Sequence, residues 1–173
     1  MSSNRLEVIN AALIKVGAET IADPDENREN ARKAKAIFDR LCRAELRKQA
    51  WSFAIKRTSL AIVDTSPVFG YSVMRQLPTD FLRLVTWGED YVFDVDGMAV
   101  PDDAPYSIEG DKIVDNESGV VFIRYVADVT GDVPIWDATF VEAFACKLAI
   151  ELSPTLQRSV TKKQDLKADY KEA

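Results

Sequence analysis

The apolar residues of this sequence change their spacing twice, and that change limits the folds that the chain can adopt. Leu6, Ile9, Leu13 and Val16 recur at the spacing of a helix. A strand-like alternation begins at Trp51, and a second helical pattern begins at Pro134. We therefore expect an α+β protein, in which residues 1–50 and 134–173 form a helical bundle. A small antiparallel β module, residues 51–133, is inserted into that bundle.

Two helices are expected in the N-terminal segment. The first covers residues 4–16, because Asn4 and Glu7 have the spacing of a capping box and Gly17 is a typical C-terminal stop. The second covers residues 26–49 and begins with acidic residues in its first turn. Its apolar residues form one stripe and its basic residues lie largely off that stripe, so we expect a long amphipathic helix with a basic face.

Two further helices are expected at the C-terminal end. A wide apolar face extends from Ile135 to Leu152. Ser153-Pro154 is predicted to end that helix and to begin a last one over residues 155–172, with Ser153 as its N-cap. The last helix has a thin apolar stripe formed by Leu156, Val160, Leu166 and Tyr170. Such a helix is either a solvated helix end or is completed by a partner that covers Leu166 and Tyr170.

The middle of the chain reads as one antiparallel sheet of five or six strands. The predicted strands include Trp51 to Ile55, Leu82 to Trp87 and Val120 to Val126, with a loop and a short strand between Phe69 and Pro78. Two hairpin turns are expected, at Asp96-Gly97 and at Gly110-Asp111, because glycine tolerates a positive φ.

Charge is distributed unevenly along the chain, whose net charge is −6. Residues 26–57 carry ten basic and four acidic groups, a net +6, whereas residues 58–134 carry four basic and fourteen acidic groups, a net −10. This polarity suits head-to-tail contacts between copies of the chain. It is equally typical of a solvated basic helix beside a solvated acidic sheet. The candidate partner-binding cations are Arg32, Lys33, Arg40, Arg43, Arg47 and Lys48.

The composition excludes most catalytic chemistry. The chain contains no histidine, which removes the usual general base and most zinc or iron sites. Cys42 and Cys146 are 104 positions apart among apolar neighbours, so we interpret them as reduced core residues. No glycine-rich phosphate loop, targeting signal or membrane-spanning run is found in the sequence. We expect a protein made in the cytoplasm that has no catalytic residues, no cofactor, no metal and no membrane partner.

Four segments, in order along the chain, carry a resemblance. They are Ile9 to Gly17, Asn30-Ala31-Arg32 through Trp51-Ser52-Phe53-Ala54, Leu77-Pro78-Thr79-Asp80-Phe81-Leu82-Arg83-Leu84, and Phe140 to Leu152 followed by a charged segment from Thr155 onward. Together they resemble the tail tubular protein A family of short-tailed bacteriophages. The resemblance implies a head-to-tail adaptor, of which twelve copies form a ring in the virion between the portal protein and the tail nozzle protein. It also implies a central channel through which DNA passes without specific binding. Relatives usually extend beyond the position of Ala173, so we expect any portal-docking extension to be shortened or absent.

Two other functions remain open from the residues themselves. Acidic pairs such as Glu89-Asp90 and Asp102-Asp103 are residue types that a glycan-active tail enzyme uses. The basic helix would suit a DNA-binding accessory factor, although it lacks interleaved surface aromatic residues.

Overall fold

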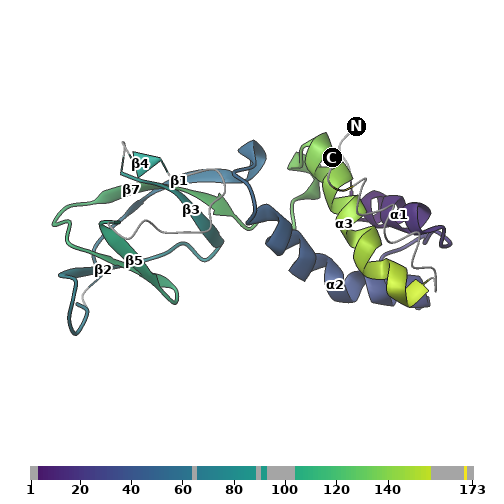
Figure 1. Ribbon diagram of the computed structural model, residues 1–173, viewed down its shortest axis with the longest axis horizontal. Coiled ribbons are helices and arrows are strands. Elements are labelled where there is room, and N and C mark those ends of the chain that lie inside the picture. The colour runs from purple at the N-terminus through teal and green to yellow at the C-terminus, as the bar shows by residue number, and fades with distance from the viewer. Residues whose placement is uncertain (1–3, 64–65, 89–90, 93–103, 157–169, 171–173) are drawn as a thin grey trace. The chain divides into compact units, whose positions relative to one another are not determined.

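The computed structural model describes residues 4–63, 66–88, 91–92, 104–156 and 170 (Figure 1). The chain is divided into two compact units. The helical unit combines Met1–Glu45 with Val129–Ala173, and the β unit is Leu46–Asp128. The sequence placed these boundaries at 50/51 and 133/134. The α+β class is confirmed, and none of the described helices is long and apolar enough to cross a membrane.

The first helix, α1 (Arg5–Val16), has both of the ends expected from the sequence. The Glu7 backbone N–H donates to Asn4 Oδ1, and the Asn4 backbone N–H donates to Glu7 Oε2, each at 2.9 Å. This capping box satisfies two donors that the helix itself leaves free. Gly17 ends the helix at φ 71°, a left-handed conformation that glycine adopts without a steric penalty.

The second helix, α2 (Glu29–Leu46), is shorter than the predicted 26–49. Local side-chain bonds hold the preceding segment in turns: the Asp25 backbone N–H donates to Asp23 Oδ1 at 2.8 Å, and Glu26 Oε2 accepts from the Ala22 backbone N–H. Such bonds compete with the first turn of a helix. At its other end, α2 stops before Arg47, which lies in a turn.

The third helix, α3 (Ala138–Leu156), follows a short 3₁₀ helix, η2 (Val133–Ile135). The predicted break at Ser153-Pro154 is wrong, because α3 continues through both residues. Pro154 removes one backbone N–H from the helix, but Ile150 and Leu152 close to it are buried, and this apolar packing keeps the segment helical. The predicted helix over 155–172 lies, apart from its start and Tyr170, outside the described residues.

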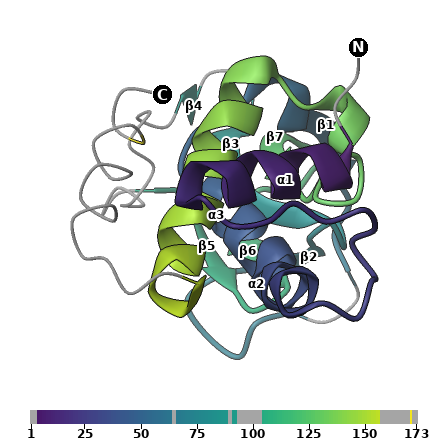
Figure 2. The same cartoon turned by 90° about the vertical axis from the view of Figure 1, so that its right-hand side faces the viewer.

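The core of the helical unit is an aromatic cluster formed by Phe38, Trp136, Phe140 and Phe144. The ring centroids of Phe38 and Phe144 are 5.0 Å apart and edge to face. Trp136 meets Phe140 in the same geometry at 5.1 Å, and its indole N–H donates to the Val129 carbonyl oxygen at 3.0 Å. Helix α1 lies against α3 (Figure 2), so residues from both ends of the chain close over this cluster.

The β unit begins with a 3₁₀ helix, η1 (Ser52–Ala54), and contains two antiparallel sheets. One sheet has the order β1 (Ile55–Leu60), β7 (Val121–Ala127), β3 (Phe81–Trp87), β4 (Tyr91–Val92). The other has the order β2 (Val73–Gln76), β6 (Lys112–Asp115), β5 (Tyr106–Glu109). The strand predicted from Trp51 begins only at Ile55, and residues 52–54 form η1 instead. The Ala54 backbone N–H bonds to the Trp51 carbonyl oxygen at 2.9 Å, which closes a helical turn and buries Ala54.

The hairpin predicted at Gly110-Asp111 is confirmed: it joins β5 to β6, and Gly110 has φ 66°. The hairpin predicted at Asp96-Gly97 lies outside the described residues. The expectation of one sheet is wrong, and a buried side chain connects the two sheets that form instead. The guanidinium of Arg75, in the three-stranded sheet, donates to the carbonyl oxygen of Leu60, in the four-stranded sheet, and to that of Gly119 before β7.

Arg75 and Asp115 form a salt bridge whose two side chains are fully buried. Arg75 Nε donates to Asp115 Oδ2 at 2.7 Å, and Nη2 donates to Asp115 Oδ1 at 3.1 Å. Nη1 donates to Leu60 O at 2.8 Å and to Gly119 O at 2.7 Å, and Nη2 also donates to Glu117 O at 2.6 Å. Each of the five guanidinium N–H donors therefore has one acceptor.

Replacing Arg75 should unfold the β unit readily. We expect Arg75→Met to lower the free energy of unfolding by about 3–5 kcal/mol, because it leaves Asp115 buried and unpaired. Arg75→Lys should also be strongly destabilising, because one ammonium group cannot serve five acceptors. Urea denaturation followed by circular dichroism measures both, with Arg40→Met, on an exposed residue of α2, as the control. A loss below about 1 kcal/mol for Arg75→Met would contradict the structural role.

A second polar group lies at the start of β3. Tyr125 Oη donates to Asp80 Oδ1 at 3.0 Å, and Lys56 Nζ donates to Asp80 Oδ2 at 2.6 Å. Burial, together with the Asp80 carboxylate, raises the pKa of Tyr125 to about 12. Burial by itself would raise the pKa of Asp80, but the bonds from Lys56 and Tyr125 outweigh it and lower that pKa.

Tyr125 should make stability depend on alkaline pH. An unfolded tyrosine ionises near pH 10, whereas folded Tyr125 keeps its proton until about pH 12. The difference in free energy of unfolding between the native chain and Tyr125→Phe should therefore be constant below pH 10 and shrink as the pH rises towards 12. Urea titrations across this range measure it. A flat profile for Tyr125→Phe across this range would refute the assignment.

Candidate functional site

The predicted basic surface is located mainly on α2. Arg32, Arg40 and Arg43 are exposed on this helix, and Lys33 is half-buried. Arg32 Nη1 donates to Asn27 Oδ1 at 3.0 Å, and Lys33 forms an ion pair with Glu29 one turn away. These contacts are typical of a solvated helix face and leave the charge accessible to a partner.

The last two predicted cations belong to the other unit. Arg47 and Lys48 lie in the turn after α2, at the start of the β unit. The Arg47 guanidinium donates to the Leu82 carbonyl oxygen, so this side chain is turned towards the β unit. The six cations are therefore divided between two units.

The predicted contact residues of the last helix are only partly described. Leu166 lies outside the described residues. Tyr170 is half-buried, its hydroxyl donates to Glu45 Oε1 at 2.7 Å, and Lys147 Nζ lies 6.0 Å from its ring centroid. Its ring and hydroxyl therefore contact α2 and α3 of the same chain.

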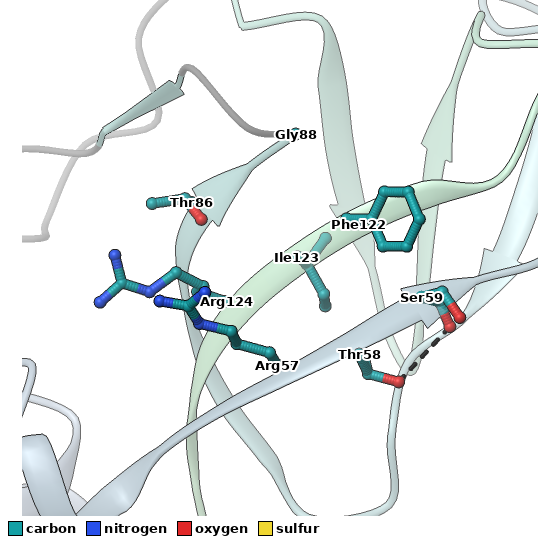
Figure 3. Close-up of a pocket in the computed structure, with 8 residues that line it drawn as sticks. All are labelled: Arg57, Thr58, Ser59, Thr86, Gly88, Phe122, Ile123 and Arg124. Carbon is teal, nitrogen blue, oxygen red and sulfur yellow. Dashed lines mark hydrogen bonds between the residues drawn. The ribbon is translucent and has the colours of Figure 1, made fainter.

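A different group of arginines lines a cavity of about 590 Å³ in the β unit. The lining residues, drawn in Figure 3, are Arg57, Thr58, Ser59, Thr86, Gly88, Phe122, Ile123 and Arg124. Strand register explains how they come together: Arg57 of β1 lies opposite Arg124 of β7, and Thr86 of β3 lies opposite Arg124 on the other side. Alternate residues of a strand face the same side of a sheet, so Ser59 and Phe122, which also lie opposite each other, share this face.

The side chains of Arg57 and Arg124 extend side by side from the two strands (Figure 3). Opposed residues in an antiparallel pair have Cβ atoms roughly 5 Å apart, and like charges at that distance destabilise the sheet. Within the described ranges, neither arginine has a carboxylate partner, and the buried Nε of Arg124 has no acceptor.

Two more arginines extend the cationic group along the sheet. Arg83 of β3 lies opposite Val126 of β7, and Val126 is two residues beyond Arg124 on β7. Burial and the nearby positive charge of Arg47 lower the pKa of Arg83. The buried Nε of Arg83, like that of Arg124, bonds to nothing in the part of the chain that the structure describes. We call Arg47, Arg57, Arg83 and Arg124 the arginine face.

The arginine face is suited to hold an anion. Guanidinium groups bind carboxylate or phosphate oxygens through two parallel N–H bonds, and their charge does not vary at ordinary pH. None of the residues that line the cavity is a histidine, aspartate, glutamate, lysine, tyrosine or cysteine that could act as a general acid or base. Across the described ranges, no three histidine, cysteine, aspartate or glutamate residues come together as a metal site. Both cysteines are free and buried.

Sequence reasoning missed the arginine face because fourteen acidic groups dominate residues 58–134. The available signal was the spacing of Phe122 and Arg124, which places both on one face of a strand that is otherwise apolar. The opposition of Arg57 and Arg124 depends on strand register, which the sequence does not specify.

Comparison with known proteins does not add a family to these observations. A scan of the sequence against models of protein families finds no match, and a search of curated proteins finds no matching relative.

Removing one charge from the arginine face should stabilise the protein. We expect Arg124→Gln to raise the free energy of unfolding by about 0.2–1 kcal/mol at low salt, since it relieves the repulsion from Arg57. The gain should shrink as salt screens the native pair. Urea denaturation at low and high salt measures this, with Arg40→Gln on α2 as the matched control. If Arg124→Gln instead lowers the free energy of unfolding, the positive charges of Arg57 and Arg124 are neutralised by other groups and do not destabilise the sheet.

Proposed function

We propose that the chain is a structural subunit of a bacteriophage virion, an adaptor that forms a ring between the portal and the tail nozzle. Twelve copies would surround a channel for DNA. The resemblance of four sequence segments to the tail tubular protein A family supports this function. The structural observation that carries it is an apolar loop that its own chain leaves uncovered.

That loop follows β1 and leads to β2. Val68 is 98% exposed and Phe69 is 87% exposed, and Gly70 turns the chain at φ 86°. Burying a valine or phenylalanine side chain is worth roughly 1.5–3 kcal/mol each, so two adjacent exposed residues favour association with another surface. A loop of this kind on every subunit suits the heterologous contacts that close a ring.

Charge supports the same mode of assembly. The exposed cations of α2 and the acidic balance of residues 58–134 offer opposite charges on different segments of each subunit. In a head-to-tail ring, each copy can present one segment to the preceding copy and the other to the next.

The two alternative functions rest on the sequence alone. The acidic pairs considered for a glycan-active enzyme, Glu89-Asp90 and Asp102-Asp103, lie outside the described residues. Of the cations considered for a DNA-binding accessory factor, four lie on α2, and Arg47 and Lys48 lie in the turn that follows it.

Assembly on the portal tests the proposal. We expect the purified chain to sediment as a monomer or small oligomer, because its composition is not that of a large apolar obligate interface. With the portal protein of the same phage, it should sediment as a complex that negative-stain microscopy shows as a twelve-subunit ring. The double variant Val68→Ser/Phe69→Ser should lose the ring and keep its fold.

Val120→Ser, which alters an exposed apolar residue just before β7, is the control and should still assemble. A native chain that never joins the portal would overturn the adaptor function. A stable ring in the absence of the portal protein would contradict the expectation that the ring forms only on the portal. Normal assembly of the double variant would show that the Val68-Phe69 loop is not part of the interface.

A further inference from the structure

Two members of the arginine face, Arg57 and Arg124, form a compact group with Ser59 and Phe122 on two neighbouring strands. Arg57 and Ser59 lie on β1, opposite Arg124 and Phe122 of β7. Residues two apart on a strand are separated by about 7 Å, so a pair of cations is followed at that distance by a ring and a hydroxyl. Phe122 is 57% exposed, although a phenylalanine on a sheet is normally covered.

We propose that the arginine face binds a strand of single-stranded nucleic acid. A phosphate group lies between Arg57 and Arg124, and the base of the same nucleotide stacks on Phe122. In a nucleotide the phosphate and the base are separated by one sugar, which matches a cation and an aromatic ring two residues apart. Guanidinium groups supply bidentate donors to the phosphate, and an exposed ring supplies a stacking surface for any base.

The remaining cations favour a strand over a single nucleotide. Arg83 of β3 lies opposite Val126, two residues past Arg124 on β7, and the Arg47 guanidinium donates to the carbonyl oxygen of Leu82, the neighbour of Arg83. This arrangement gives a row of cations leading away from Phe122, as a backbone with successive phosphates requires.

The ring also distinguishes a single strand from other anions. A carboxylate from an acidic segment of another copy would neutralise the arginines but leave Phe122 uncovered. The bases of a duplex are paired and stacked on one another, so their faces are not available to the ring. The site is therefore proposed for unpaired bases, without sequence preference.

Fluorescence anisotropy with a labelled oligothymidylate of about 12 nucleotides tests the proposal on the full chain. We expect binding at low salt that weakens steeply as salt is added, because phosphate contacts release counterions. Arg57→Gln/Arg124→Gln should weaken binding at least tenfold, and Phe122→Leu, which keeps an apolar side chain, at least about fivefold. The single variant Arg124→Gln should also weaken binding, whereas Arg40→Gln on α2, which removes the same single charge, should change affinity less than twofold.

Circular dichroism melting of all four variants should show that they remain folded, so a loss of binding cannot be due to unfolding. The proposal is overturned if the native chain does not bind the oligonucleotide at low salt, or if Arg40→Gln weakens binding as much as Arg124→Gln. It is also overturned if duplex DNA of the same length, or a thymidine mononucleotide, binds as tightly. Failure here leaves ring formation on the portal unaffected, so the two proposals are tested separately.

Discussion

The β unit depends on one buried guanidinium group. Arg75 is held by both oxygens of Asp115 and by three backbone carbonyl oxygens, and these acceptors come from both sheets and the turn that joins them. An unpaired donor at this depth would cost several kcal/mol, so the five bonds allow little variation in how the strands meet. The register of β1 against β7, and with it the opposition of Arg57 and Arg124, is set within this framework.

Two kinds of arginine coexist within the same unit. Arg75 has an acceptor for every donor and serves the fold, whereas Arg57 and Arg124 oppose each other across a strand pair with no carboxylate among the described residues. A protein selected for stability alone would separate or neutralise that pair. The retained repulsion is the physical reason for assigning the arginine face to an anionic partner.

Local chemistry made part of this fold predictable. The capping box of Asn4 and Glu7 and the turn at Gly110 depend on neighbouring residues, and both were correctly predicted. Predictions failed where tertiary packing decided the outcome. Burial of Ile150 and Leu152 keeps α3 helical past Pro154, and burial of Ala54 favours a helical turn over a strand. The arginine face was not predictable, because its residues come from three strands and the turn after α2.

The division of the chain also constrains the order in which its parts form during synthesis. The β unit is one continuous segment, Leu46–Asp128, whereas the helical unit needs residues from both ends of the chain. Lys15 of α1 pairs with Glu142 of α3, and Phe38 packs on Phe144 across more than a hundred residues. On the ribosome, α1 and α2 emerge long before the helix that covers them. The apolar faces of α1 and α2 therefore stay uncovered by α3 until the entire β unit has been synthesised. The β unit can fold around Arg75 before that.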